Sequence, residues 1–363
     1  MRDDLVAWLR LTLSPGVFEP WQRALLREFG TPARAVAAPL ASASDVVPRH
    51  VAEGLAQGPS TETLERTLRW LEQPGHHLVA LADPEYPKAL LEISDPPTVL
   101  YVIGRTDLLN APGLAIVGSR NASPRGMLDA QAFAHALSDA GLGIVSGLAL
   151  GIDAAAHRGG LAGASSSVAV LGTGADVMYP KRNMELAAQL AAHGTLVSEF
   201  PLGTPPLREN FPRRNRLISG LSRGVLVVEA ALASGSLVTA HAALEQGREV
   251  FAIPGSIHSP FSKGCHHLIR QGAKLVETAG DVLEELRLPF AAPNLAAPAK
   301  LSPAQAAFLD AMGVAPVTID QVAATTGRAA ADVAACMSEL EIAGVIASAA
   351  GGRFQRLSDP VIE

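Results

Sequence analysis

Apolar positions in the first hundred residues follow the spacing of helices. Leu5, Leu9 and Leu13 lie four residues apart and form one apolar face. A Ser-Pro-Gly turn then interrupts the pattern, and a second helix is expected from about residue 19 to residue 29. Two short helices joined by such a turn indicate a helical domain of the SAM or helix-hairpin-helix kind over residues 1–107. Few basic residues lie near the turn, so a packing role is favoured over contact with nucleic acid.

A different pattern follows, in which short β-rich apolar runs are each followed by glycines and then by a helical stretch. Alternation of strands and helices at this spacing predicts an α/β fold with a parallel sheet and crossover helices on both faces, an extended Rossmann-like core over residues 108–287. Ligands of such sheets bind at the carboxyl ends of the strands. The expected strands are Leu114–Val117, Gly143–Ser146, Ser167–Leu171, Gly194–Ser198, Gly224–Glu229 and Glu249–Ile253.

A Pro/Ala-rich linker over residues 288–300 separates the core from a last domain, residues 301–363. This domain is expected to hold three helices and a β-hairpin, the pattern of a winged helix, with Ser302 and Thr318 as helix N-caps. The expected elements are helices 302–312, 318–326 and 329–343 and the hairpin 345–357. The third helix carries three acids and no Lys or Arg, which favours contact with protein over contact with DNA.

Composition narrows the class of protein. No stretch approaches the ~20 apolar residues of a membrane helix, and the N-terminus lacks the pattern of a signal peptide, so we expect a cytoplasmic protein without membrane contact. Cys265 and Cys336 are far apart, which predicts free thiols in a reducing compartment. Aromatic residues make up only 4% of the chain, which argues against an extensive base-stacking surface.

An arginine cluster stands out against the formal net charge of −6. Five arginines lie between residues 208 and 223 with a single acid, and three of them fall in the run Phe211-Pro-Arg-Arg-Asn-Arg216. Guanidinium groups are planar and permanently charged, and they bind phosphate through two parallel hydrogen bonds. The run therefore favours a polyanion as ligand. The alternative is that these arginines pair with acids from elsewhere in the fold.

Glycines follow three successive expected strands. Backbone N–H groups at such turns can approach an oxyanion closely, and together the turns predict a phosphate-binding edge of the sheet. The sequence lacks a P-loop, and Val177 interrupts a dinucleotide fingerprint, so nucleotide hydrolysis and dinucleotide chemistry are disfavoured. The residues of this edge are Gly118, Ser119, Arg120, Gly147, Gly172 and Gly174, and Lys181 with Asn183 adds a second polar cluster to it.

Side-chain patterns for catalysis or metal binding are weak. Ser236 lacks the surroundings of a nucleophile elbow. The adjacent His266 and His267 have no partners at metal-ligand spacing, so no metal and no cofactor are expected. Asp153 and His157 lie four residues apart at a helix start, where they are expected to form a structural pair.

The motifs of the core, taken together and in order, closely resemble those of the DNA-processing protein A (DprA, or Smf) family. The resemblance covers about 170 residues, and the two flanking domains also match the layout of that family. It is carried by Val117-Gly-Ser-Arg120, Ser146-Gly-Leu-Ala-Leu-Gly-Ile-Asp153, Leu171-Gly-Thr-Gly-Ala-Asp176, Tyr179-Pro180, Ser198-Glu-Phe-Pro201, the arginine run, Ser234-Gly-Ser-Leu-Val-Thr-Ala240, Ile253-Pro-Gly255 and Gly264-Cys-His-His-Leu-Ile269. One departure is the His pair, where many members have Thr-Asn.

The resemblance implies a non-enzymatic protein of natural transformation and recombination. Such a protein binds and protects incoming single-stranded DNA, loads the RecA recombinase on it, forms a homodimer and has single-strand-binding protein as a further partner. The DNA contacts that it implies fall on Arg120, Lys181 and the arginines of the run; with the polar residues around them, the expected DNA-binding set adds Arg208, Arg213, Arg214, Asn215 and Arg216 to the glycine edge. The implied dimer surface contains Leu244, His266, Ile269 and Leu275.

An enzyme is the alternative. The core is also similar to Rossmann-type nucleoside-monophosphate phosphoribohydrolases, whose glycine-rich phosphate loop occupies the place of residues 234–239 here. This chain has one glycine, Gly235, where that loop needs three.

Overall fold

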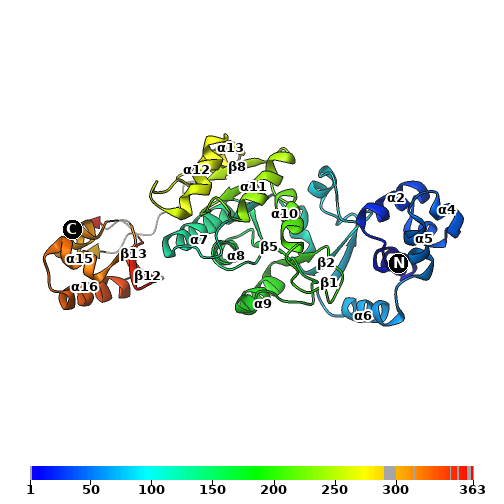
Figure 1. Ribbon diagram of the computed structural model, residues 1–363, viewed down its shortest axis with the longest axis horizontal. Helices are drawn as coiled ribbons and strands as arrows, with labels where there is room; N and C mark the ends of the chain where they lie inside the picture. The colour runs from blue at the N-terminus through cyan, green and yellow to red at the C-terminus, as the bar shows by residue number, and fades with distance from the viewer. Residues whose placement is uncertain are drawn as a thin grey trace.

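The computed structural model describes residues 2–289, 300–313, 315–343, 345–349, 351–357 and 361–362. Three regions follow one another along the long axis of the molecule, with the N-terminal helices and the C-terminal domain at opposite ends of a central sheet (Figure 1). None of the helices in the described part of the chain is long and apolar enough to cross a membrane.

Six helices form the N-terminal region. The first two, α1 (Arg2–Leu13) and α2 (Glu19–Phe29), have the bounds that the apolar spacing predicts. The others are α3 (Pro32–Ala37), α4 (Leu40–Ser44), α5 (Arg49–Gln57) and α6 (Thr61–Leu71). Their apolar faces pack around Leu11, Leu25 and Trp70, and the same cluster includes Tyr101 from the sheet. The helices are thereby attached to the central region.

The expectation that residues 1–107 are helical is wrong for two segments. Residues His76–Ala80 form strand β1 and residues Val99–Gly104 form β2, which pair antiparallel with each other. Strand β2 also pairs antiparallel with β6 of the core, so both strands extend the central sheet. Residues 99–103 are five consecutive apolar residues between Thr98 and Gly104, too short a run for a helix.

The central sheet has nine strands in the order β1-β2-β6-β5-β4-β3-β7-β8-β9. From β6 to β9 all pairs are parallel, and the expected α/β fold is confirmed. The strands are β3 (Gly113–Val117), β4 (Gly143–Ser146), β5 (Ser167–Val170), β6 (Thr195–Ser198), β7 (Gly224–Val227), β8 (Glu249–Ala252) and β9 (Lys274–Leu275). Because β3 lies between β4 and β7, the direction of strand succession reverses there, and such a switch point opens a ligand crevice at the carboxyl ends.

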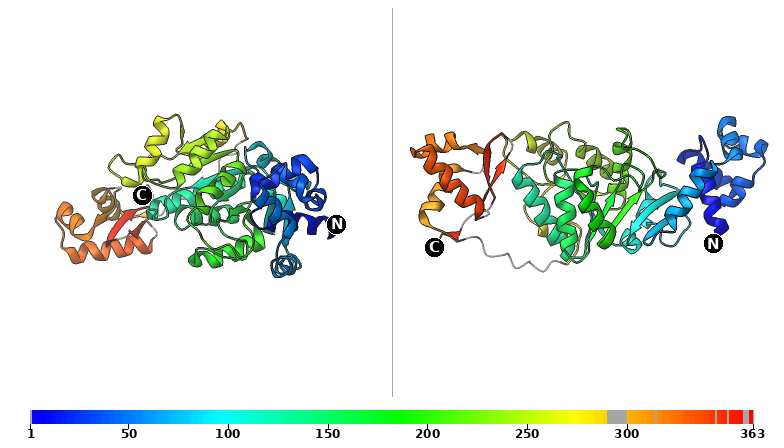
Figure 2. Two further views of the ribbon diagram at one scale, coloured as in Figure 1. Left: turned by 45° about the vertical axis from the view of Figure 1, so that its right-hand side comes forward. Right: turned by 90° about the horizontal axis from the view of Figure 1, so that it is seen from below.

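Helices cover both faces of the sheet (Figure 2). Alternate residues of one strand enter different apolar clusters: Val117 packs in the cluster that contains Leu217, and Ile116 in the cluster that contains Leu137. Two-sided burial explains why the strands are continuous apolar runs. The helices are α7 (Pro124–Asp139), α8 (Ile152–Ala162), α9 (Met184–His193), α10 (Asn210–Gly220), α11 (Ser236–Glu245), α12 (Lys263–Arg270) and α13 (Ala279–Glu285). Short 3-10 turns are η1 (Lys88–Glu92), η2 (Thr106–Asn110), η3 (Lys181–Asn183) and η4 (Pro260–Ser262).

The C-terminal domain is a winged helix. Ser302 and Thr318 cap helices α14 (Pro303–Met312) and α15 (Ile319–Thr326) as expected, each within a capping box completed by a glutamine. Helix α16 (Ala330–Ile342) is followed by the wing strands β12 (Ile346–Ala349) and β13 (Arg353–Arg356). Short pairs add β11 (Val317–Thr318) to the wing and join β10 (Lys300–Leu301) to β14 (Val361–Ile362). Residues 290–299 of the expected linker lie outside the described residues.

Candidate nucleic-acid interface

A cleft of about 840 Å³ opens at the carboxyl ends of β3, β4 and β7, at the switch point of the sheet. Its walls come from the loop after β3, the loop after β4, the start of α10 and the start of α11. Sequence-predicted residues that line it are Gly118, Ser119, Arg120, Arg208, Arg214 and Asn215. The structure therefore brings together side chains that are up to 97 positions apart, from residue 118 to residue 215.

Arg120 is the cation best placed for a ligand in this cleft. Its side chain is exposed, and its guanidinium carbon lies 5.5 Å from the centre of the Phe211 ring. The ring of Tyr179 packs beside the ring of Phe211, with 5.8 Å between the two ring centres. An exposed cation beside two rings can bind a phosphate and a stacked base at the same time. Sequence reasoning missed this aromatic pair, because the low aromatic content gives no sign that Tyr179 and Phe211 meet.

Two loops fix the backbone beneath Arg120. The amide N–H of Ile152 donates to the carbonyl oxygen of Ser119. Gly151, the residue before Ile152, has a φ of +75°. A side chain on Gly151 would overlap the carbonyl oxygens of Ser119 and Arg120, so only glycine lets the loop after β4 lie against the loop after β3. The position of Arg120 therefore depends on a residue of the neighbouring loop.

Arg214 lies beneath the cleft and is 4% exposed. Its Nη1 donates to the carbonyl oxygens of Gly147, at 2.7 Å, and of Val170. Burial lowers the pKa of Arg214 to about 10, although the nearby Asp153 opposes that shift. Burial likewise raises the pKa of Asp153, which accepts hydrogen bonds from the amides of Gly147 and Ala149. Arg214 thus joins the ends of β4 and β5 and has little surface left for a ligand.

Arg213 and Arg216 face away from the cleft, because residues three apart on a helix share a side. Arg213 lies 2.7 Å from Glu19, and Arg216 lies 2.9 Å from Asp95. Both guanidinium groups also contact the buried carboxyl group of Glu199. These contacts attach helix α2 to the core, and they support the alternative in which the arginines pair with acids of the fold.

Glu199 is the centre of this ion cluster. Burial, together with the nearby carboxylate of Glu19, raises the pKa of Glu199 to about 8, against the opposing effect of Arg216. A neutral Glu199 leaves two arginines facing the carboxylates of Glu19 and Asp95, so the cluster is balanced in charge.

Most glycines of the expected phosphate-binding edge allow close packing of the protein rather than contact with a ligand. The amide of Gly147 donates to Asp153, and that of Gly174 donates to the carbonyl oxygen of Thr204. The expectation that these two N–H groups bind an oxyanion is therefore wrong. A side chain at Gly172 would overlap the ring of Phe211, and one at Gly147 would overlap the guanidinium of Arg214. Gly118 alone of these glycines lines the cleft.

The remaining expected contacts divide into exposed and buried groups. Lys181 is exposed in η3, whereas Asn183 is buried and its Nδ2 donates to the carbonyl oxygens of Leu148 and Ala149. Asn183 therefore shapes the loop after β4. Asn215 lies at the cleft wall with its Nδ2 3.4 Å from the carbonyl oxygen of Gly235.

The expected pairing of Asp153 with His157 is wrong. His157 Nε2 accepts from the amide of Leu148, and its Nδ1 lies 2.7 Å from the hydroxyl of Ser167. Complete burial lowers the pKa of His157 to about 3, which keeps the imidazole neutral. The two side chains hold different parts of the same loop.

Residues of the expected dimer surface lie on α11, α12 and β9. Leu244 and Leu275 are exposed, Ile269 packs partly against the core, and His266 Nε2 lies 2.9 Å from the carbonyl oxygen of Gly255. No group of three potential metal ligands occurs in the part of the chain that the structure describes.

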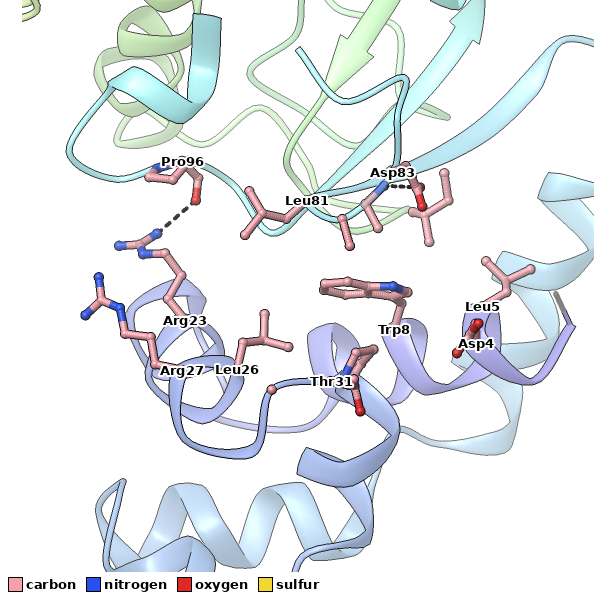
Figure 3. Close-up of a pocket in the computed structure, with 15 residues that line it drawn as sticks. Asp4, Leu5, Trp8, Arg23, Leu26, Arg27, Thr31, Leu81, Asp83 and Pro96 are labelled. Atoms are coloured by element: carbon pink, nitrogen blue, oxygen red, sulfur yellow. Dashed lines mark hydrogen bonds between the residues drawn. The ribbon is translucent and has the colours of Figure 1, made fainter. Parts of the chain in front are cut away.

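A larger cavity, about 1140 Å³, lies between α1, α2 and the segment after β1 (Figure 3). Trp8, Leu26 and Leu81 make its walls mainly apolar, and Arg23 at one end donates to the carbonyl oxygen of Pro96 at 3.1 Å. It shares no lining residue with the cleft, which remains the better candidate because it lies at the switch point of the sheet and contains the exposed Arg120 beside the rings of Phe211 and Tyr179.

Comparison with known proteins identifies the family. Residues 77–287 match the family model described as DNA recombination-mediator protein A, and residues 291–352 match the model of the DprA winged helix domain. The chain belongs to the DprA family. Protein Smf of Escherichia coli is 47% identical to it over 304 residues, which cover 80% of each chain.

Solved structures of DprA proteins share the fold. The X-ray structure of DNA processing protein A from Streptococcus pneumoniae matches with a TM-score of 0.68 and 37% identity, over 79% of this chain and 98% of that one. The DNA processing protein A of Helicobacter pylori, whose structure is described in terms of a single-stranded DNA binding mode, matches with a TM-score of 0.53 and 30% identity, over 58% of this chain and 96% of that one.

Proposed function

We propose that this DprA-family protein binds single-stranded DNA across the cleft, protects it and loads RecA on it during natural transformation and recombination. The observation that carries the proposal is the exposed guanidinium of Arg120 above the ring of Phe211, inside a cleft at the switch point. Support comes from the Helicobacter pylori relative, whose structure concerns single-stranded DNA. Stacking favours single strands, because bases in a duplex are already stacked on each other.

Phosphate and base contacts have separate places in this scheme. Arg120, Arg208 and the more distant Lys181 are exposed cations that follow the backbone of the strand. Phe211 and Tyr179 offer rings to its bases. Arg214 acts indirectly, by holding the floor of the cleft.

The proposal includes a homodimer in the cytoplasm that carries out no catalysis. Leu244 on α11 and Leu275 on β9 are exposed apolar side chains, as a two-fold contact requires. A dimer would align two clefts into one longer track for DNA. Single-strand-binding protein is a further partner in this proposal, since RecA has to displace it from the strand.

A gel-shift titration of single-stranded against duplex DNA, at ~50 and ~200 mM salt, tests the binding step. We expect preference for the single strand and a steep loss of affinity with salt. Arg120→Ala should weaken binding about tenfold, since a charge-assisted contact contributes roughly 1.5–3 kcal/mol. The matched control is Arg158→Ala, which removes an exposed arginine of α8 that does not line the cleft.

Equal losses in the two variants, or no binding by the unchanged protein, would contradict the proposal. RecA filament formation on DNA coated with single-strand-binding protein tests the loading step, and it should accelerate when this protein is added. Release of free base from nucleoside monophosphates would instead support the phosphoribohydrolase-like enzyme.

A further inference from the structure

The ring of Phe211 rests directly on the backbone of Gly172, in the loop after β5. A β-carbon on Gly172 would lie 2.8, 3.0 and 3.5 Å from three carbon atoms of that ring, which are the nearest atoms apart from those of the two chain neighbours. The φ of Gly172 is outside the left-handed region, so its backbone conformation alone would admit an alanine. The ring of Phe211 is therefore what requires a glycine at position 172.

The loop that contains Gly172 is held in place on both sides of its next residue, Thr173. The hydroxyl of Thr173 donates to the carbonyl oxygen of Val177 at 2.7 Å, and the carbonyl oxygen of Thr173 accepts from the hydroxyl of Ser198 at 2.6 Å. The loop cannot move away from the ring without loss of these buried hydrogen bonds. Tyr179, near the end of the same loop, packs beside the ring of Phe211, so the loop contacts this ring at two places.

The helix that carries Phe211 is fixed as well. Arg214, one turn further along α10, is buried and donates to the carbonyl oxygens of Gly147 and Val170. With loop and helix both held, a side chain at position 172 would have to displace the ring. Carbon atoms in contact are about 3.5–4.0 Å apart, so the displacement is roughly 1 Å. The ring would then leave its place beneath the guanidinium of Arg120.

We propose that Gly172 is a positioning residue for single-stranded DNA, because its lack of a side chain sets the place of the Phe211 ring on which a base stacks. The inference rests on the proposed function, since stacking needs a strand in the cleft. It replaces the expectation that Gly172 contacts a phosphate through its own amide. Gly172 is buried and is absent from the described residues that line the cleft, which favours the indirect role.

A double-mutant cycle tests the proposal, with affinity for a single-stranded oligonucleotide measured by fluorescence anisotropy. Phe211→Ala should weaken binding about tenfold, because it removes a stacking surface. Gly172→Ala should weaken binding several-fold. The double variant should bind as Phe211→Ala does, because the added methyl group has no ring to displace.

Gly143→Ala is the matched control. Gly143 is also buried, at the start of β4 and so at the opposite end of that strand from the cleft. A β-carbon there would meet its nearest atoms at 3.5 and 3.6 Å, which is ordinary contact. This variant should change neither affinity nor melting temperature.

Thermal melting of the same variants separates the ring from other causes. Gly172→Ala should melt a few degrees lower, because the overlap with the ring strains the packing. In the Phe211→Ala background the same substitution should leave the melting temperature unchanged. If Gly172→Ala is too unstable for binding assays, the comparison of the double variant with Phe211→Ala still decides the question.

Unchanged affinity in Gly172→Ala would overturn the inference. So would a double variant that binds more weakly than Phe211→Ala, since Gly172 would then act on DNA directly, or one that melts lower, since the ring would then not be what excludes the side chain. These results leave binding in the cleft untouched. Absence of single-strand binding by the unchanged protein would overturn the proposed function together with this inference.

Discussion

Replacing Arg214 by alanine separates a structural role of the arginine run from a role in binding. The substitution removes two hydrogen bonds from a charged donor to the carbonyl oxygens of Gly147 and Val170. It also leaves the buried Asp153 without the cation that favours its ionised form. The change therefore acts on the junction of β4 and β5, not on a surface that DNA can reach.

The size of the effect follows from these losses. Removing one member of a buried charged pair costs about 3–5 kcal/mol of unfolding free energy. For a domain of this size, each kcal/mol lowers the melting temperature by roughly 2–4 °C, so Arg214→Ala should melt roughly 6–20 °C lower. Protonation of Asp153, whose pKa is already raised, favours the lower end of this range.

Differential scanning fluorimetry and a single-stranded DNA titration, both on the same preparations, measure the two quantities. Arg120→Ala is the matched comparison, because that side chain is exposed and should affect affinity but not melting. An unchanged melting temperature for Arg214→Ala, with single-strand binding weakened about tenfold as for a direct charge-assisted contact, would refute the assignment of Arg214 to the floor of the cleft.

Two further predictions concern assembly and pH. Leu244→Arg places a charge at an exposed apolar position of the expected dimer surface, so light scattering should report monomers with unchanged melting; a persistent dimer excludes this surface. Because the folded-state pKa of Glu199 is raised to about 8, the folded state holds a proton that the unfolded state releases, and stability should fall as pH rises from 6.5 to 8. Glu199→Gln should remove that slope in urea denaturation, whereas an identical slope in the variant would exclude Glu199 as its source. The pKa of His157 is lowered to about 3 in the folded state, so His157 changes the pH dependence of stability only below its unfolded-state pKa of 6.5. It therefore does not affect the slope between pH 6.5 and 8.

Local patterns were sufficient to predict most of the fold. The parallel strands are short apolar runs, and glycines follow β3, β4 and β5 closely. The helix caps Ser302 and Thr318 follow from side-chain chemistry within one turn. The two antiparallel strands were missed for the opposite reason. Strand β2 pairs with the preceding strand β1 and with β6, almost a hundred residues away, and the pairing with β6, which joins both strands to the core sheet, cannot be seen from local spacing.

The candidate site could be predicted only in part, because its geometry depends on contacts between distant segments. The sequence shows an arginine run but not the acids that face it, since Glu19, Asp95 and Glu199 come from three separate segments. Helical periodicity alone would have placed Arg213 and Arg216 on one side and Arg214 on another. It could not have shown which side faces solvent.

Helix α10 couples the position of the N-terminal helices to the shape of the cleft. On one side Arg213 and Arg216 hold Glu19 of α2, and on the other Arg214 holds the ends of β4 and β5. A displacement of α2 would therefore shift α10 through these ion pairs. The first turn of α10 also contains Phe211, whose ring lies beneath Arg120. Since close-packed interiors transmit strain, the contacts of Arg213 and Arg216 with Glu19 and the contacts in the cleft should not be independent. If the protein binds DNA as proposed, the arginine run contributes mainly through the architecture that it maintains, and the direct contacts are expected from exposed neighbours such as Arg120 and Arg208.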